Sequence, residues 1–439
     1  MDILYMVSVL LLLIVLLISG VPVPFSFGGA IIFLVVVYGF PPAGLLQTAY
    51  AKLGSVTLLA IPMFILAGGV MEKGNIGKAL VDWVNIFVGR VKGGLAVVTV
   101  VASAVFGSIC GSGAATLSCI GSIMAPRMRE KKYPLGVAAA VACCAGTLGL
   151  LIPPSAMQIL VAWTLNLSVL ACFLSTVVPG IILTVLLSIG AVILLRHDKG
   201  VITEAKLAPS AWSRVLIKKT GTAIPALLMP VIILGGIYSG IMTATESAGV
   251  AVIYAIPVAI YLYRGMRWRD LGKSLVETCT TTGVIMVMIG FVMMLSRILT
   301  QMNVPQSLVN AMLSISENKI ILLLMLNIFL VLLGMIMDDT SATLLAAPML
   351  YPLICELGIP PYQFAAILGV NIGMGNITPP SAPFLYLSSR IYGVDVGQVM
   401  KPVLFLLFFA YIPTLLLVTY VPDVSLWLPR VLLGDAFPF

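Results

Sequence analysis

Charged residues are scarce in this chain of 439 residues, since Asp, Glu, Lys and Arg together make up only 9% of it. Soluble domains carry about 25% charged residues, so the composition excludes a soluble globular protein. Histidine occurs once, as His197 in a basic stretch, and we expect it to be a solvated loop residue. The seven cysteines fall inside apolar segments without the spacing of metal ligands, and we expect them to pack as small apolar residues.

Sequence signals of several other protein classes are also missing. The chain holds no GxxxxGK phosphate-binding loop, so direct coupling to ATP is not supported. Its first residues lack the basic segment of a secretory signal, and we expect residues 4–20 to form a retained membrane span. The net charge of +8 comes from basic residues in short loops between apolar runs. That pattern sets membrane orientation and does not indicate a nucleic-acid partner.

Long apolar runs dominate the sequence, which is 61% apolar and has a mean hydropathy of +1.15. A helix needs about 20 such residues to cross a bilayer. The runs predict an all-α membrane protein without a soluble domain. Ten transmembrane helices are expected, at residues 4–20, 25–40, 54–71, 134–160, 169–195, 222–240, 247–263, 277–298, 362–387 and 399–421.

Two further apolar stretches, residues 95–128 and 320–353, are interrupted in the middle. The sequences GSICGSG (107–113) and DDTS (338–341) divide them into halves of roughly 15 residues, which are short for a crossing. We therefore predict two re-entrant hairpins, over residues 92–130 and 319–356. Their non-helical tips must be buried in protein or line a wet cavity.

The basic residues predict the orientation in the membrane. The predicted spans place twenty of the 24 Lys and Arg residues on one side and leave Lys52, Arg297, Lys319 and Arg430 on the other. The richer side should be cytoplasmic. We expect a multi-pass protein of a bacterial inner membrane, in contact with lipid and with both termini in the periplasm. The first hairpin would enter from the cytoplasm and the second from outside.

An internal repeat organises the chain. Residues 149–155 (GLLIPPS) match 375–381 (GNITPPS), 226 positions later, and Ala125-Pro126 corresponds to Tyr351-Pro352 at the same offset. Residues 75–81 (NIGKALV) resemble 303–309 (NVPQSLV), 228 positions later. Repeats of this kind decide a fold.

Each repeat would contribute three crossings, and two crossings lie between the repeats, so the second repeat is predicted to be inverted relative to the first. Inverted repeats with interrupted helices are typical of secondary transporters. The predicted parts are N-terminal scaffold helices (1–53), repeat one (54–195, broken helix 134–160), a cytoplasmic basic loop with linking helices (196–276), repeat two (277–421, broken helix 362–387) and a C-terminal tail (422–439).

The two Pro-Pro-Ser sequences mark the helix breaks. Proline lacks an amide hydrogen and clashes with the preceding turn, so a pair of prolines unwinds a helix and frees backbone carbonyls. Such carbonyls hold Na⁺ in transporters of this type, although a plain proline kink filled by packing is the alternative. The predicted sodium ligands, at the breaks and the hairpin tips, are Ser108, Ser112, Gly149, Ile152, Pro153, Ser155, Asp338, Thr340, Gly375, Thr378, Pro379 and Ser381.

The hairpin tips are the predicted anion site. The half-helix after each tip directs its amide-rich N-terminus at the cavity, which suits a carboxylate. For the first tip, close packing of small residues is an equal alternative. The predicted substrate ligands are Gly111, Gly113, Thr116, Asp339, Ser341 and Thr343.

Three acidic residues have two readings each. Asp338 and Asp339 lie at membrane depth, where a carboxylate is costly and usually functional. One of them is expected either to cap the following half-helix or to help balance bound Na⁺. Glu246, at the start of a span, is either the acid of a capping box with Thr243 or a transport residue.

Several of these motifs resemble those of a known family. The tip at 107–116, the Thr-x-Thr-Glu sequence at 243–246, the segment from Met337-Asp338 to Pro352 and both Pro-Pro breaks resemble the large membrane subunit of tripartite ATP-independent periplasmic (TRAP) transporters, the DctM-like subunit. The resemblance implies a sodium-driven, elevator-type importer of sialic acid, C4-dicarboxylates or related organic anions. It also implies a periplasmic substrate-binding protein and a small four-span membrane subunit as partners, with Na⁺ as coupling ion and no other cofactor.

The sequence departs from the family pattern at a few positions and leaves other functions open. Ala244 and Ser341 stand where the family commonly has Pro, and Cys110 and Gly113 where hydroxyl residues are frequent. A stand-alone sodium–dicarboxylate symporter is the main alternative. An intramembrane aspartyl protease would need an Asp where this chain has Asn376. A scaffold subunit would not need two unwound helices, so we expect a transporter and not an enzyme.

Overall fold

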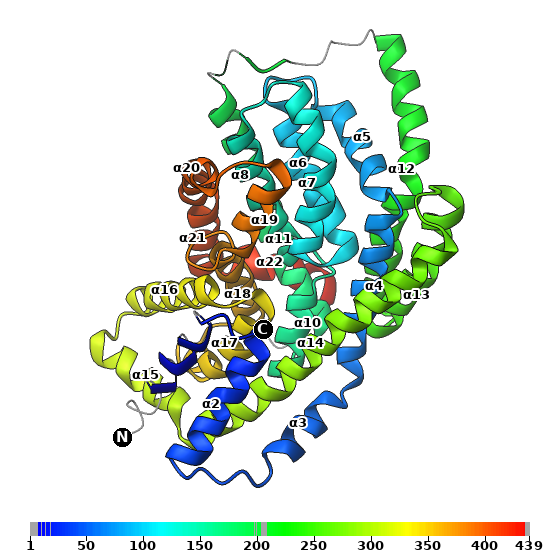
Figure 1. Ribbon diagram of the computed structural model, residues 1–439. Helices are drawn as coiled ribbons and strands as arrows, with labels where there is room; N and C mark the ends of the chain where they lie inside the picture. The colour runs from blue at the N-terminus through cyan, green and yellow to red at the C-terminus, as the bar shows by residue number, and fades with distance from the viewer. Residues whose placement is uncertain are drawn as a thin grey trace.

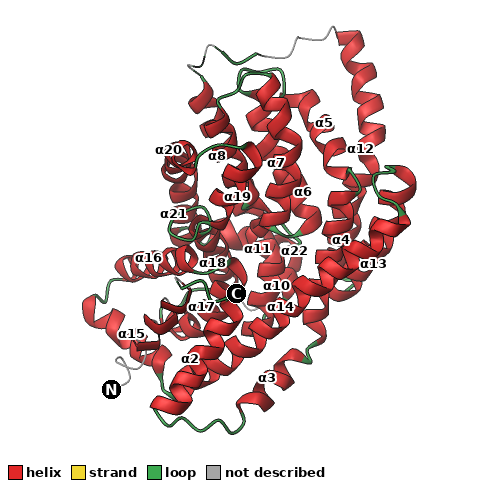
Figure 2. Cartoon of the chain, viewed as in Figure 1, coloured by secondary structure: helices red, strands yellow, loops and turns green. Residues whose placement is uncertain are grey.

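The structure is a computed structural model, and every regular element in the part of the chain that it describes is a helix (Figure 2). His197 lies outside the described residues, as do residues 4–7, 10, 14 and 18 of the predicted span 4–20. The described residues are 8–9, 11–13, 15–17, 19–196, 198, 200–202 and 209–434.

The helices fall into two series separated by the gap after residue 202. The first series is α2 (Val23–Val37), α3 (Leu45–Leu53), the 3₁₀ turn η1 (Val56–Leu59), α4 (Ala60–Lys73), α5 (Ile76–Val88), α6 (Gly94–Cys110), α7 (Gly113–Glu130), α8 (Leu135–Gly146), α9 (Leu148–Leu151), α10 (Ala156–Leu165) and α11 (Val169–Leu195). The second series is α12 (Pro209–Tyr238), α13 (Ala244–Pro257), the π-turn η2 (Val258–Leu262), α14 (Trp268–Gln301), α15 (Val304–Ile315), α16 (Lys319–Ile336), α17 (Asp339–Glu356), α18 (Pro361–Gly375), α19 (Pro383–Tyr392), α20 (Val396–Leu406), the π-turn η3 (Leu407–Tyr411), α21 (Ile412–Tyr420) and α22 (Asp423–Leu433).

Eight helices among the described residues are long and apolar enough to cross a membrane. Seven of them coincide with predicted spans, and the eighth is α16, the first arm of the predicted second hairpin. The predicted span 25–40 corresponds to α2, which has only 15 residues, and the span 362–387 is divided into α18 and α19. Ten full spans is therefore more than helix length alone supports in the described residues.

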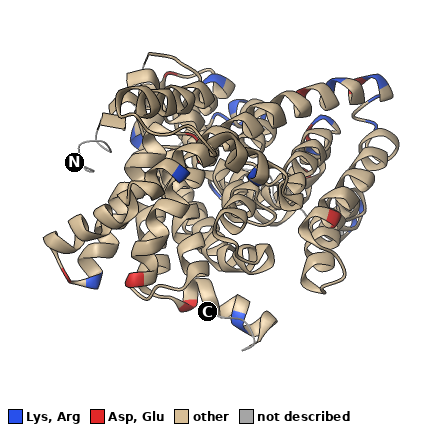
Figure 3. Ribbon diagram, turned by 90° about the horizontal axis from the view of Figure 1, so that it is seen from below, with Lys and Arg blue, Asp and Glu red and all other residues tan. Residues whose placement is uncertain are grey.

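The long helices expose apolar side chains on their outer faces. On α11, Ile181, Val185, Ile189 and Ile193 are all exposed, and their spacing of four places them along one side of the helix. A continuous apolar stripe of this kind marks contact with a membrane or a partner. Charged residues are sparse and lie mainly at helix ends and in loops (Figure 3).

Several boundaries differ from the sequence prediction. The basic segment after residue 196 is helical from Pro209 onward, so Arg214, Lys218 and Lys219 belong to α12. Its charged first turns interrupt the apolar run, which hid the start of the helix. The predicted C-terminal tail contains α22, which packs against α11.

The internal repeat has a local counterpart in the structure. Asn75 precedes α5 with φ 61°, and Asn303 precedes α15 with φ 53°. Asparagine tolerates this left-handed conformation better than most residues. The two segments that matched in sequence therefore begin helices through the same kind of turn.

The two halves of the chain interlock around the helix breaks (Figure 1). The hairpin α6–α7 packs on α8, and α16 packs on α18. The short helix after each break packs against the hairpin of the other half: α10 packs against α17 of the second hairpin, and α19 packs against α7 of the first. The long helix α14 runs past these elements and contacts α2, α3, α4 and α17. Both hairpins and both breaks thus belong to one core.

An ion-pair cluster joins two helices of the first half, α5 and α7, to the linking helix α12. The Asp82 carboxylate on α5 lies 2.7 Å from Arg127 Nη2 on α7 and 2.7 Å from Lys219 Nζ on α12. Trp83 Nε1 adds a hydrogen bond to Thr220 Oγ1 of 3.1 Å. Burial raises the pKa of Asp82, but hydrogen bonds and charges from Lys219 and Arg127 outweigh it and hold the pKa below the ordinary 3.8.

This cluster predicts a pH-dependent contribution to stability. A carboxyl with a lowered pKa stabilises the fold above its unfolded value and loses that contribution as the pH falls through the folded value. Asp82→Asn should lower the unfolding temperature of the purified protein at pH 7. The difference from wild type should shrink as the pH falls below 3.8. A difference that stays constant from pH 7 to pH 3 would show that the pair does not contribute in this way.

Candidate functional site

The first hairpin turns through two residues. Helix α6 ends at Cys110, Gly111 takes φ +63°, and α7 begins at Gly113. Ser112 caps α7, its Oγ accepting a hydrogen bond of 3.5 Å from the Ala115 amide. Glycine meets the left-handed φ at little cost, which explains the sharp turn at the tip.

This tip packs directly on the first helix break. A Cβ added at Gly107 would lie 2.8 Å from Gly149 Cα, and one added at Gly111 would lie 2.5 Å from the Pro154 carbonyl oxygen. The Ala156 amide, at the start of α10, donates a 3.2 Å hydrogen bond to the Gly111 carbonyl. The small residues of the tip therefore serve close backbone packing, as one of the two readings of the sequence expected.

Three of the four hydroxyl residues predicted as ligands at the first tip and break donate to backbone carbonyls. Ser108 Oγ donates to the Val105 carbonyl at 2.7 Å, Thr116 Oγ1 to Ser112 at 2.8 Å, and Ser155 Oγ to Leu150 at 2.7 Å. The helix stops between α9 and α10, where Ile152, Pro153, Pro154 and Ser155 are non-helical. The hydroxyl oxygens of Ser108, Thr116 and Ser155 retain lone pairs and can still accept a hydrogen bond or bind a cation.

The second hairpin turns at an acidic cap. Helix α16 ends at Ile336 and α17 begins at Asp339. Asp338 Oδ2 accepts hydrogen bonds from the amides of Thr340 at 3.2 Å and Ser341 at 3.4 Å, and Ser341 Oγ donates to Oδ1 at 2.5 Å. Asp338 is therefore the N-cap of α17, one of the two roles that the sequence suggested.

The second break packs against α16 by close backbone contact, as the first break does against the first hairpin tip. Gly334 and Gly375 meet backbone to backbone, since a Cβ on Gly375 would lie 2.4 Å from Gly334 C. The Ser381 amide and Oγ both donate to the Met335 carbonyl, at 3.0 Å and 2.6 Å. Thr378 Oγ1 donates to Met374 at 2.7 Å. Pro379 and Pro380 lie in the non-helical segment before α19.

Asn376 was not among the predicted site residues. It is fully buried at the end of α18, and neither Oδ1 nor Nδ2 has a hydrogen-bond partner within the described residues. The first break has Leu150 at the matching position. A buried amide without partners is costly, and the exchange of Leu for Asn between the repeats was the signal that could have found it.

The two hairpin tips meet at a cavity of about 410 Å³. Five of the predicted site residues line it, namely Gly111, Ser112, Asp338, Asp339 and Thr340. The lining does not include the predicted residues of the two breaks, nor Ser108, Gly113, Thr116, Ser341 and Thr343. Its other walls come from Ile65, Gly68, Gly69, Glu72, Cys110, Ala115, Ala156, Ser274, Glu277, Thr278, Thr281 and Ile285.

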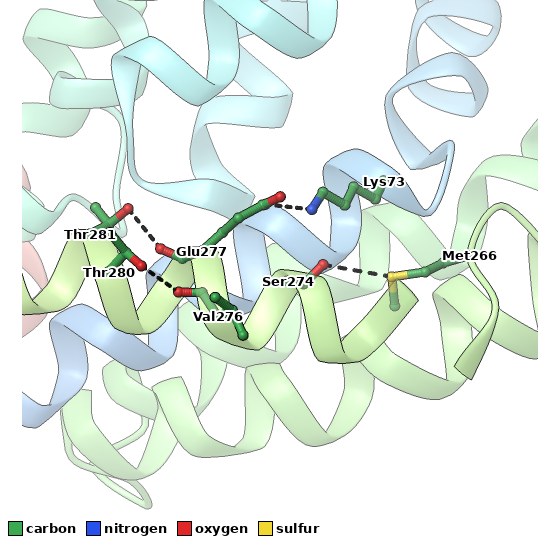
Figure 4. A network of polar contacts seen from close by, with 7 residues as sticks. All are labelled: Lys73, Met266, Ser274, Val276, Glu277, Thr280 and Thr281. Carbon is green, nitrogen blue, oxygen red and sulfur yellow. Dashed lines mark hydrogen bonds and ion pairs between the residues drawn. The ribbon is translucent and has the colours of Figure 1, made fainter. Parts of the chain in front are cut away.

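The contribution of α4 and α14 was also missed. Glu72 lies in the last turn of α4. Ser274, Thr278 and Thr281 share one face of α14, as their spacing of four and three requires. Glu277, on the same helix, lines the cavity and pairs with Lys73, the two side chains pointing toward each other in Figure 4. The signal in the sequence was an acidic and hydroxyl-rich segment at the start of a predicted span.

Glu246 forms the capping box that the sequence allowed. The Thr243 amide donates to Glu246 Oε2 at 2.8 Å, and the Glu246 amide donates to Thr243 Oγ1 at 3.2 Å. Glutamine can take the same place in a capping box. We therefore expect Glu246→Gln to keep wild-type uptake in reconstituted vesicles, and Glu246→Ala to lower the unfolding temperature. A loss of uptake in Glu246→Gln would instead require the charge itself.

Helices that stop inside an apolar protein and aim polar groups into one cavity belong to a recognisable class. Membrane-embedded backbone leaves the helical conformation only where it is buried in protein or lines a wet cavity. Interrupted helices around a midplane site are typical of secondary transporters. The fold and the cavity thus define a membrane transport protein.

Comparison with known proteins identifies the family. Residues 10–424 match the tripartite ATP-independent periplasmic transporter, DctM component. The C4-dicarboxylate TRAP transporter large permease protein DctM of Pseudomonas aeruginosa is 37% identical over 85% of this chain and 86% of its own length. The sialic acid TRAP transporter large permease protein SiaM of Vibrio cholerae is 32% identical over 95% and 97%. This chain belongs to the DctM family of TRAP transporter large permeases, which confirms the resemblance seen in the sequence.

Solved structures support the fold. The Alcanivorax borkumensis YdaH transporter superimposes with a TM-score of 0.59 at 16% identity, covering 87% of this chain and 89% of its own. Neisseria gonorrhoeae MtrF superimposes with a TM-score of 0.57 at 13% identity, covering 86% and 84%. At these identities the likeness shows a shared helical fold and nothing further.

Proposed function

We propose that this permease imports small organic anions together with Na⁺, and that both bind at the cavity between the two hairpin tips. The observation that carries the proposal is the cavity itself, because it is lined by Ser112 from one tip and by Asp338, Asp339 and Thr340 from the other. Carboxylate, hydroxyl and carbonyl oxygens are the ligands that hard cations such as Na⁺ take in transporters of this type. The N-termini of α7 and α17 supply amide dipoles for an anion.

The coupling follows from shared geometry. Each tip is tied to its own break, by the Ala156–Gly111 hydrogen bond in one half and the Ser381–Met335 hydrogen bonds in the other. An ion bound between a tip and its break would order both, and the ordered tips would present the anion site. A ligand shifts a conformational equilibrium only by its differential affinity for the two states, so Na⁺ and anion together would favour the transporting state.

The same proposal includes an elevator movement in inverted repeats. The hairpins, breaks and the helices α8, α10, α18 and α19 form one packed unit, and α14 with α2, α3 and α4 forms a wall beside it. Movement of the packed unit against this wall would carry the cavity across the membrane. The basic-rich side is proposed to be cytoplasmic.

The proposed substrate class and partners are based on the family to which the chain belongs. Relatives include permeases named for C4-dicarboxylate, sialic acid and isethionate, so we propose a small organic anion with a carboxylate or sulfonate group. A periplasmic binding protein is proposed to deliver it, and a small four-span membrane subunit to complete the transporter.

Reconstitution tests the proposal. The purified chain would be placed in liposomes with and without its small subunit and binding protein, and uptake of labelled succinate, N-acetylneuraminate and isethionate measured. We expect uptake of at least one anion that requires an inward Na⁺ gradient and both partners. Uptake by the chain alone would favour the stand-alone symporter, and uptake unchanged when choline replaces Na⁺ would contradict sodium coupling.

A further inference from the structure

One ion pair lies at the wall of the cavity. Lys73, the last residue of α4, pairs with Glu277 of α14 (Figure 4). Of the ion pairs that the described residues form, this one alone involves a residue that lines the cavity between the tips. The side chains are 34% and 65% exposed, which places the pair at the mouth of the cavity and not in its depth.

The charge of the cavity wall makes this lysine significant. The described lining contains four acidic residues, Glu72, Glu277, Asp338 and Asp339, and neither Lys nor Arg. An organic anion that approaches such a wall meets like charges, which repel it. Asp338 is occupied as the cap of α17, but Glu277 makes its contact with the partly exposed ammonium group of Lys73. Lys73 is therefore the positive side chain in contact with this lining.

Hydroxyl groups extend from the ion pair along the cavity. Ser274, Thr278 and Thr281 of α14 line it beside Glu277. Thr281 Oγ1 donates to the Glu277 carbonyl at 3.0 Å, and Ser274 Oγ is 4.0 Å from Met266 Sδ (Figure 4). Ser274 and Thr281 each lie one turn from Glu277 along α14. When these hydroxyl groups rotate from their present partners, they and the Lys73 ammonium group are suitable donors for the oxygens of a carboxylate or sulfonate.

The pair is also suited to exchange. Exposed Lys–Glu pairs contribute little to stability, because solvent screens them and the side chains lose freedom when they pair. A carboxylate brought by the substrate can therefore replace that of Glu277 at small cost. We propose that Lys73 binds the anionic group of the transported molecule at the mouth of the cavity, and that Glu277 is the resident counter-ion which the substrate displaces. This inference rests on the proposed function and assigns it a substrate-binding residue.

Opposite substitutions should have opposite effects on affinity. The binding of succinate, N-acetylneuraminate and isethionate to the full purified chain would be measured by titration in Na⁺ buffer. Lys73→Gln should weaken binding of the accepted anion about tenfold, as loss of a charge-assisted contact does. Glu277→Gln should tighten it several-fold, because the competing carboxylate is gone. The double variant should behave like Lys73→Gln, and Lys73→Arg should retain most of the affinity.

A purely structural ion pair would give a different pattern. If Lys73 and Glu277 only tie α4 to α14, both single variants should lower the unfolding temperature and weaken binding together, and that result would overturn the proposal. Lys78→Gln is the matched control, because Lys78 is an exposed lysine of the nearby α5 and should leave affinity unchanged. Wild-type protein that binds none of the anions would overturn the proposed function as well. Sodium-dependent wild-type binding with both variants shifted in one direction would overturn only the role of Lys73.

Discussion

Replacing Asp338 with Asn is expected to lower sodium-driven uptake at least tenfold while the protein remains folded. Asp338 caps α17 through the amides of Thr340 and Ser341 and lines the cavity. Asn caps helices about as well as Asp, so this substitution removes the charge and keeps the cap. If the carboxylate balances bound Na⁺, its loss should weaken the cation site, since removal of a partner from a charge-assisted contact costs more than that of a neutral one.

Two further variants separate the functions of Asp338. Asp338→Ala removes both charge and cap, and should lower the free energy of unfolding by about 1 kcal/mol in addition to the loss of uptake. Asp395→Asn is the matched control, because Asp395 precedes α20, is exposed and makes no side-chain cap. Uptake by Asp338→Asn at the wild-type rate, with uptake lost only in Asp338→Ala, would show that capping is the whole role of this residue.

Adding a methyl group at Gly375 is expected to have the second large effect. Its Cβ would lie 2.4 Å from Gly334 C and 2.6 Å from Gly334 Cα, which are backbone atoms that cannot rotate away. Gly375→Ala must therefore push α16 from α18 at the second break. Overpacking of this kind typically costs about 1–3 kcal/mol, and the displaced break should also reduce uptake. Unfolding temperature and initial uptake rate would be measured on the same preparation.

The opposite glycine of this contact provides the control. A Cβ added at Gly334 would lie 3.3 Å from Gly375 Cα, a contact that a shift of a few tenths of an ångström relieves. Gly334→Ala should therefore be clearly milder than Gly375→Ala in both measurements. Equal effects of the two substitutions, or wild-type behaviour of both, would contradict the close backbone contact on which the second break is built.

The sequence predicted the interruptions of the helices well, because their causes are local. Paired prolines at 153–154 and 379–380 cannot continue a helix, and the structure is non-helical at both places. Gly111 and Asp338 stand at the two hairpin turns, where a left-handed φ and a helix cap are required. Such features can be predicted from the sequence because they depend only on the residues at the turn or break itself.

The features that the sequence could not predict depend on tertiary contacts, or on helix length where a hairpin arm is as long as a membrane span. Helix α16 has 18 residues and all but a few of them are apolar, so hydropathy cannot distinguish a hairpin arm from a span. The packing of α10 and α19 against the hairpin of the opposite half cannot be read from the residue pattern of either helix. The α14 wall of the cavity was missed for the same reason, since Ser274, Thr278 and Thr281 become site residues only when α4 and the two tips pack beside them.

Whether anion and Na⁺ share one site can be measured directly, as the affinity of the purified permease for its anion with and without Na⁺. If both ligands share the cavity between the tips, Na⁺ must raise the affinity for the anion, and the anion must raise the affinity for Na⁺ by the same factor. Titration in Na⁺ and in choline buffer should show this reciprocal increase in the wild type and its loss in Asp338→Asn. Equal anion affinity in the two buffers would contradict a common site at the hairpin tips.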